Sequence, residues 1–180
     1  MRTCLIALLC PLALCATGAR AEVKEAGADH LLLQDHLDVR TPPDQLYATV
    51  VDIGHWWNGA HTYSGDATHL SLQPEAGGCF CERWGGYSVA HGRVIWAAPG
   101  HVLRLEAPLG PLQSMAVEAV MTFTFKPSAQ GTALEFEYRV NGSSASGLDK
   151  LAAGVDAVLS EQLQRLQRYA ETGTAPPARP

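Results

Sequence analysis

The stretch VEAVMTFTFKPSAQGTALEFEYRV, residues 117–140, decides the fold class. In each half of it apolar and polar side chains alternate, and Gln130-Gly131 between the halves is a typical turn signal. The alternating apolar positions are Met121, Phe123, Phe125, Leu134, Phe136 and Tyr138. A period of two predicts two antiparallel strands with one buried face and one solvated face.

Short apolar runs of the same kind extend back to residue 70. Turn residues such as Gly77-Gly78, Gly85-Gly86 and Pro99-Gly100 separate them. With the stretch above, the runs predict strands over 70–73, 79–84, 89–96, 102–107, 117–126 and 132–140. An earlier strand is predicted over 30–40, and Thr41-Pro42-Pro43 then marks the start of a short helix over 45–51.

The segment 147–172 carries apolar residues at spacings of three and four, which predicts a long amphipathic helix. Gly173 ends it, and the Pro-rich residues 173–180 are expected to be disordered. The strands can bury their apolar faces only if the sheet curls around this helix. We therefore predict an α+β helix-grip architecture: a curved antiparallel sheet of about seven strands around a C-terminal helix, with a cavity at one end.

The first residues have the pattern of a secretion signal. Arg2 precedes an apolar run over 4–16, and Ala19-Arg20-Ala21 provides a cleavage site after Ala21. A lipoprotein signal with Cys15 is the less favoured alternative, because Leu14 stands where a small residue is expected. The sequence thus predicts a signal peptide (1–21), a leader (22–29), one domain (30–172) and a tail (173–180). The protein would be periplasmic or secreted, with no stable membrane insertion after cleavage.

Composition argues against several classes of partner. The chain has 13 Lys and Arg, two of them in the predicted signal peptide, against 18 Asp and Glu, and it lacks a basic cluster, so nucleic acid is not expected to bind. Its paired glycines stand between strands and not before helices, which argues against nucleotide cofactors. His55, His61 and His69 lack the spacing of metal ligands, so we predict neither a metal nor another cofactor.

Cys79 and Cys81 are the two cysteines that remain after signal cleavage. They stand two apart in a predicted strand, so they share a face and do not form a disulfide framework. We favour two reduced thiols packed as small hydrophobic groups, although an oxidising compartment would permit a disulfide between them. The sequence does not decide their redox state.

The order of several short motifs along the chain resembles that of the START-like superfamily (SRPBCC). This superfamily includes Bet v 1-like, polyketide cyclase/dehydrase-like and activator of Hsp90 ATPase-like proteins. The resemblance covers residues 30–172 and rests on Thr41-Pro42-Pro43, Asp52 to Trp57, Gly77 to Glu82, His91 to Val94, Gly131 to Leu134 and Val155 to Leu159. It implies a hydrophobic ligand cavity between the sheet and the final helix. It transfers no catalytic set, because members range from lipid carriers to cyclases and chaperone cofactors.

The leading functional hypothesis is the binding of a small hydrophobic or amphipathic molecule in that cavity. Aromatic and aliphatic side chains of the strands, the final helix and the Trp-Trp step are the candidate contacts. They are Trp56, Trp57, Trp84, Trp96, Met121, Phe123, Phe136, Tyr138, Leu151 and Val155. A partner-binding module that uses the outer sheet face is a third possibility, for which no specific signal is present.

The alternative hypothesis is an enzyme of the cyclase, dehydratase or isomerase kind. Asp35, which interrupts an apolar strand face, His91 and Tyr138 are its candidate acid/base groups, provided that they converge in the cavity. Asp35 could instead reach solvent at a strand end or bulge. Strict alternation puts His91 and Arg93 on one strand face and Trp96 on the other, but does not decide which of the two faces meets the cavity.

Overall fold

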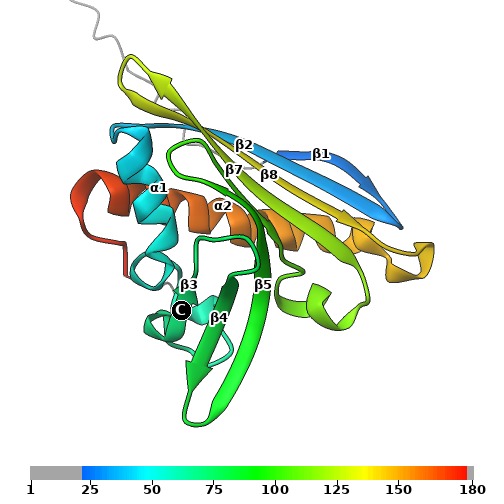
Figure 1. Cartoon of the computed structure of the whole chain (residues 1–180). Helices are drawn as coiled ribbons and strands as arrows, with labels where there is room; N and C mark the ends of the chain where they lie inside the picture. The colour runs from blue at the N-terminus through cyan, green and yellow to red at the C-terminus, as the bar shows by residue number, and fades with distance from the viewer. Residues whose placement is uncertain (1–21, 178–180) are drawn as a thin grey trace, which may run out of the picture.

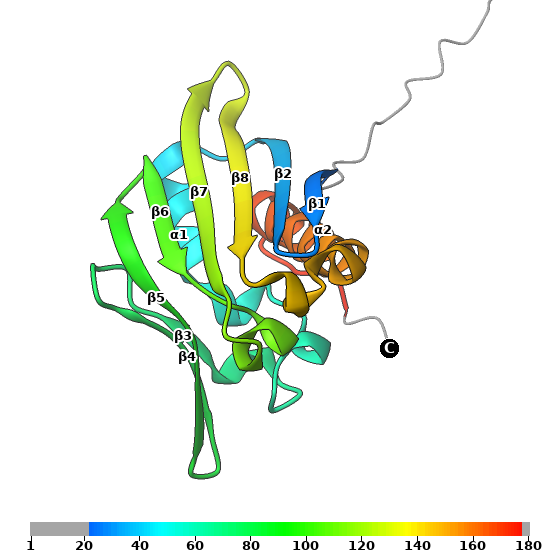
Figure 2. The ribbon, with the colours of Figure 1, turned by 90° about the vertical axis from the view of Figure 1, so that its right-hand side faces the viewer.

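Eight antiparallel strands form one sheet in the order β1-β2-β8-β7-β6-β5-β4-β3. A computed structural model describes residues 22–177, so the signal-peptide prediction lies outside the described residues. The strands are β1 (Glu22–Gly27), β2 (His30–Val39), β3 (Leu70–Leu72), β4 (Cys79–Trp84), β5 (Tyr87–Ala98), β6 (Val102–Glu106), β7 (Glu118–Ser128) and β8 (Gly131–Asn141). The helices are α1 (Pro43–Val51) and α2 (Leu148–Thr172). Figures 1 and 2 show the sheet curving around α2, which confirms the predicted α+β helix-grip fold class.

The β7–β8 hairpin has the predicted alternation. Phe123 pairs with Phe136 across the two strands, and their ring centroids are 5.1 Å apart. Both side chains are buried, as are Met121 and Tyr138 in the next pair of facing positions. The inward apolar residues in the middle of the sheet therefore form one packed core with the helices.

The helix α2 lies between αL glycines at both ends, Gly147 and Gly173. Both glycines have positive φ, which residues with a Cβ rarely adopt, so the two glycines determine where the helix begins and ends. It packs mainly against β1 and β2, and its first backbone N–H, at Leu148, donates to Ala28 between those strands. Within residues 22–177 no helix is both long and apolar enough to cross a membrane.

The ends of the domain differ from the sequence interpretation. Residues 22–27 of the expected leader form the edge strand β1, which pairs with β2. The tail residues up to 177, expected to be disordered, fold back onto α2, because Arg165 Nη1 donates to the carbonyl oxygen of Pro176 at 2.7 Å. The same guanidinium donates through Nε to Trp56 O at 2.8 Å, so it joins the tail to the segment after α1.

Cys79 and Cys81 are joined by a disulfide, so the preferred interpretation of two reduced thiols was wrong. They lie on the same face of β4, and Phe80 between them points to the opposite, buried side. Side chains two apart on a strand point the same way, which brings the two sulfur atoms to the same side of β4.

Two bulges bend β5. Cys81 pairs with Ala90 and Phe80 with Gly92, which leaves His91 as an extra residue, and the register shifts again between Val94 and Trp96. A bulge of this kind interrupts alternation and increases the local twist. Figure 2 shows the resulting bend of β5 along the outer side of the sheet.

Candidate functional site

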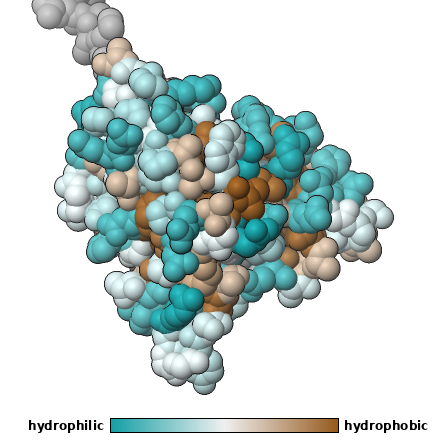
Figure 3. Space-filling model, in the orientation of Figure 1, coloured by the Kyte–Doolittle hydropathy of each residue, from teal (hydrophilic) through white to brown (hydrophobic). Residues whose placement is uncertain are grey.

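A pocket of about 390 Å³ opens where the β4–β5 hairpin, α2 and two loops meet. Its wall is mainly apolar, as expected of a small-molecule site. The lining residues are Trp57, His61, Thr62, Tyr63, Leu70, Phe80, His91, Leu109, Gly110, Pro111, Leu112, Gly154, Val155, Val158 and Leu159. On the face shown in Figure 3 the surface is largely hydrophilic, and the hydrophobic residues appear in small areas between polar ones.

Trp57 and Phe80 form the aromatic wall of the pocket. Their ring centroids lie 6.0 Å apart in an edge-to-face arrangement, a favourable geometry for aromatic pairs. The indole Nε1 of Trp57 donates to His61 O at 3.2 Å, which fixes the ring relative to its own loop. Trp57 therefore offers an apolar surface with its one donor already used.

The helix side of the pocket contains a gap at Gly154. A Cβ built on this glycine would meet no atom of a neighbouring segment within 4 Å. Glycine inside a helix costs about 1 kcal/mol relative to alanine, so the position forgoes stability while leaving space beside the pocket. Val155, Val158 and Leu159 line the same side of the pocket.

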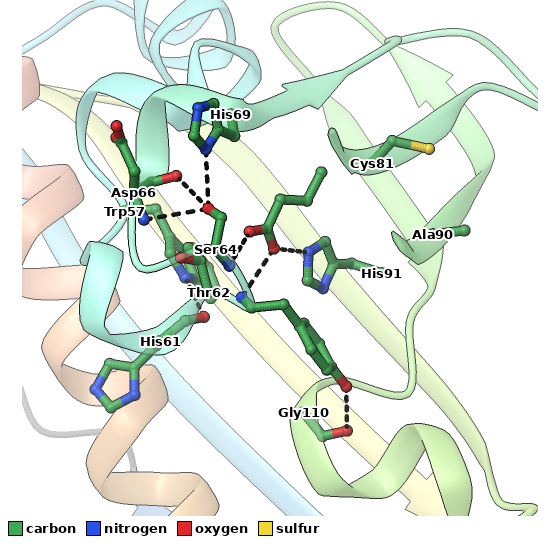
Figure 4. Close-up of polar contacts among 12 residues, drawn as sticks. Trp57, His61, Thr62, Ser64, Asp66, His69, Cys81, Ala90, His91 and Gly110 are labelled. Atoms are coloured by element: carbon green, nitrogen blue, oxygen red, sulfur yellow. Dashed lines mark hydrogen bonds and ion pairs between the residues drawn. The ribbon is translucent and has the colours of Figure 1, made fainter. Parts of the chain in front are cut away.

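One polar pair enters this apolar wall. His91 Nε2 lies 2.9 Å from Glu82 Oε2, and the two side chains are 7% and 0% exposed. The same carboxylate accepts hydrogen bonds from the backbone N–H groups of Tyr63, at 3.0 Å, and Ser64, at 2.6 Å (Figure 4). Burial alone would raise the pKa of Glu82, but the hydrogen bonds from Ser64, Tyr63 and His91 outweigh it and lower the pKa below its ordinary value.

The bulge in β5 explains how His91 reaches the pocket. Alternation from the sequence placed His91 and Arg93 on one face, but the extra residue separates them. His91 is buried beside Phe80, with ring centroids 4.9 Å apart, whereas the Arg93 side chain is 58% exposed and pairs with Glu106. Trp96, expected on the face opposite Arg93, is also exposed, and it packs under the guanidinium of Arg104.

Tyr63 lies at the mouth of the pocket. Its hydroxyl hydrogen is shared between Gly110 O at 3.4 Å and Gln113 Oε1 at 3.3 Å, so Tyr63 joins the loop after Trp57 to the loop before β7. The ring of Tyr63 contacts the ring of His91, and 53% of the Tyr63 residue is exposed to solvent. The loop that carries Tyr63 is held to the pocket wall by the backbone bond to Glu82.

Of the ten predicted ligand contacts, Trp57 and Val155 line this pocket. Trp56, by contrast, is buried, and its Nε1 donates to Thr49 O. Trp84 contacts Tyr87 in a tilted arrangement at the tip of the β4–β5 hairpin, Trp96 faces outward, and Leu151 packs against the core. The remaining predicted contacts fill the sheet core: Met121, Phe123, Phe136 and Tyr138.

The three predicted acid/base candidates do not converge. Tyr138 is fully buried, and its hydroxyl donates to Ala107 O at 2.8 Å and accepts from Leu109 N. Burial raises its pKa. Asp35 is half-buried on β2 facing α2, where burial first and then the charge of Asp156 raise its pKa. Of the three, only His91 lines the pocket, so acid/base chemistry by this set loses its geometric support.

Glu82 was missed by sequence reasoning, although a signal was present. It stands two residues after Phe80 and therefore shares the inward face of β4. A carboxylate on the buried face of a strand is expensive unless it is hydrogen-bonded, so this position marked a polar site as clearly as Asp35 did.

The three histidines weighed for a metal each contact a different group: His55 pairs with Asp52, His61 with Glu161 and His69 with Ser64. In the part of the chain that the structure describes, no group of three or more potential ligands is placed to hold a metal ion.

A larger hollow of about 920 Å³ lies on the outward face of the sheet. Solvated charged and polar side chains line much of it, including Lys24, His36, Asp38 and Glu135. The smaller apolar pocket is the better candidate site, because its wall combines aromatic surface with one buried polar pair.

No family model matches the chain, and no curated protein does. Solved structures do match. The conserved protein of unknown function EF2215 from Enterococcus faecalis has a TM-score of 0.61 at 12% identity, over 92% of this chain and 84% of that one. CalU16 from Micromonospora echinospora has a TM-score of 0.52 at 13% identity, over 86% of this chain and 85% of that one. The di-domain ARO/CYC StfQ from the steffimycin biosynthetic pathway has a TM-score of 0.53 at 12% identity. In that case the match covers 79% of this chain and 51% of the other.

The chain therefore shares its fold with these solved structures. The identities are too low to transfer an activity.

Proposed function

We propose that this protein binds a small, largely apolar molecule in the pocket beside Trp57. The observation that carries the proposal is an apolar pocket of about 390 Å³ in a fold whose core is otherwise packed. Sites for small organic ligands typically have volumes of about 300–1,000 Å³ and few polar groups.

The lining also fits a ligand with one polar end. Trp57, Phe80 and the aliphatic residues of α2 provide apolar surface, and His91 provides a buried polar contact. An amphipathic molecule would bury its apolar part against the indole and direct its polar group toward the imidazole. The gap at Gly154 widens the pocket on the helix side.

The test is binding of 1-anilinonaphthalene-8-sulfonate, an apolar fluorescent dye with one anionic group. Gly154→Leu places a side chain beside the pocket and should weaken binding at least about 10-fold, because it competes for the apolar volume. Ala153→Leu, at an exposed position of the same helix, is the matched control and should bind as the parent does. Equal binding by all three proteins would refute the proposal.

We further propose that the protein works outside the cytoplasm, as a periplasmic or secreted carrier. The signal-like pattern of residues 1–21 supports this, and so does the Cys79–Cys81 disulfide, because disulfides persist in oxidising compartments. Mass spectrometry of the intact chain recovered from its own host tests the proposal. A mature N-terminus at Glu22 is expected, and a full-length chain that starts at Met1 would refute it.

A further inference from the structure

Glu82 and His91 form a hydrogen-bonded pair whose side chains are both buried. Two buried polar side chains lie where apolar residues would fill the same wall, and burying a carboxylate costs free energy unless its hydrogen bonds are complete. Here three donors reach the carboxylate: His91 Nε2 and the backbone N–H groups of Tyr63 and Ser64. The pair is therefore a built polar site, and its member His91 lines the pocket.

The partners of Glu82 determine which nitrogen of His91 carries the proton. An ionised carboxylate only accepts hydrogen bonds, so Nε2 must be the donor in the Glu82–His91 bond. In the neutral imidazole the other nitrogen, Nδ1, then has a free lone pair. Among the described residues no hydrogen bond is made to Nδ1, and in Figure 4 this nitrogen points away from the carboxylate, toward the side where Gly110 lies.

The surroundings hold the imidazole in place. Its ring contacts Phe80 on one side, at a centroid distance of 4.9 Å, and Tyr63 on another, at 5.7 Å. A carboxylate on one imidazole nitrogen orients the ring and stabilises the imidazolium that forms when the other nitrogen accepts a proton. The His91 side chain is only 7% exposed, which limits competition by water for that lone pair.

We propose that His91 is a general base, positioned by Glu82, that removes a proton from an acidic C–H group of the small apolar molecule bound in this pocket. The inference rests on the proposed binding function and gives it a reaction class. In the step the C–H bond breaks, its electron pair moves into an adjacent carbonyl or electron-poor ring, and the proton goes to Nδ1. Return of that proton to another atom of the conjugated product completes an isomerisation, which needs no co-reactant.

The probe for this test is 5-nitro-1,2-benzisoxazole, a small apolar ring system that needs only one base. Removal of its ring C–H proton breaks the ring N–O bond and yields 2-cyano-4-nitrophenolate, which is coloured. We expect saturable elimination by the parent protein. His91→Gln should lower kcat by about 10²-fold or more, with KM changed less than about 3-fold, because general-base catalysis typically contributes about 10²–10⁴-fold.

The matched control is His101→Gln, which alters an exposed histidine in the turn between β5 and β6 and should leave the rate unchanged. Displacement of the fluorescent dye by the probe measures entry into the pocket separately from the reaction. Displacement together with an undiminished kcat in His91→Gln would overturn the base and leave the binding function standing. Failure of the dye and the probe to bind at all would overturn both.

A measurement on the unmodified chain covers the case in which His91→Gln does not fold. Nitrogen-15 NMR of labelled histidine should show the proton of His91 on Nε2, and an unprotonated Nδ1 whose resonance shifts when the dye is added. A proton found on Nδ1 instead would overturn the proposal, because that nitrogen would then have no lone pair to accept another.

Discussion

Replacing Glu82 with Gln tests whether one buried carboxylate holds the wall and the mouth of the pocket together. The amide keeps the size of the side chain but replaces one carboxylate oxygen with an NH₂ group. If the NH₂ group takes the position of Oε1, it faces the backbone N–H of Ser64. If it takes the position of Oε2, it faces the backbone N–H of Tyr63. Either orientation leaves a buried donor without an acceptor.

We expect Glu82→Gln to lower the free energy of unfolding by about 3 kcal/mol at neutral pH. A hydrogen bond to a charged group is worth about 1.5–3 kcal/mol, and a buried donor left unpaired costs about 1–3 kcal/mol. Urea unfolding followed by tryptophan fluorescence measures the difference. Glu106→Gln is the matched control: the side chains of its exposed pair with Arg93 are 58% and 52% accessible, so we expect about 0–1 kcal/mol.

The difference should also depend on pH. Because the pKa of Glu82 is lowered in the folded state, its contribution is present above the ordinary carboxyl pKa and is lost as the pH falls through the lowered value. The parent and Glu82→Gln should therefore converge in stability below about pH 4. Equal unfolding midpoints at neutral pH, or a gap that widens on acidification, would refute the role assigned to Glu82.

Three other substitutions test separate contacts by thermal unfolding. Asp35→Asn should stabilise the fold at neutral pH, because the buried Oδ2 atom of Asp35 has no hydrogen-bond partner and the charge of Asp156 lies nearby. We expect a gain of about 0.5–1 kcal/mol, since solvent screens part of the unfavourable charge. Because folding raises the pKa of Asp35, the parent protein gains stability as the pH falls through the raised pKa, and the advantage of the Asn variant should vanish in acid. An advantage that persists in acid would contradict this explanation. Gly92→Ala should cost about 1–3 kcal/mol, because its Cβ would lie 2.7 Å from atoms of the neighbouring chain segment, and an unchanged midpoint would show that the segment yields. Arg165→Met should cost about 2 kcal/mol, because it leaves the buried carbonyl of Trp56 without its donor, and a neutral result would mean that water replaces the guanidinium.

Periodicity in the sequence predicted most of the fold. The alternation in 117–140 and the three-and-four spacing in 147–172 correspond to β7, β8 and α2, with ends that differ by one or two residues. These elements are predictable because each buries one face, and burial of one face imposes a period on the sequence. The edge strand β1 was missed, since the EVKEAG segment is mostly solvated and shows no such period.

The candidate site was much less predictable. Trp56 and Trp57 are adjacent, and the orientation of a short 3-10 turn decides which of them lines the pocket. His91 was identified as a candidate, but its position inside the pocket depends on a bulge that alternation does not reveal. Glu82, the partner of His91, is separated in the sequence from the loop that contains Tyr63, and only the folded chain brings these groups together.

The extra residue in β5 also affects how relatives of this chain should be compared. Deleting one residue between Trp84 and Gly92 would restore strict pairing across the hairpin and turn the imidazole to the solvent side, even if a histidine still aligned at that position. Hairpin length, and not the presence of histidine alone, thus distinguishes homologues that can share the chemistry proposed for His91 from those that share only the fold.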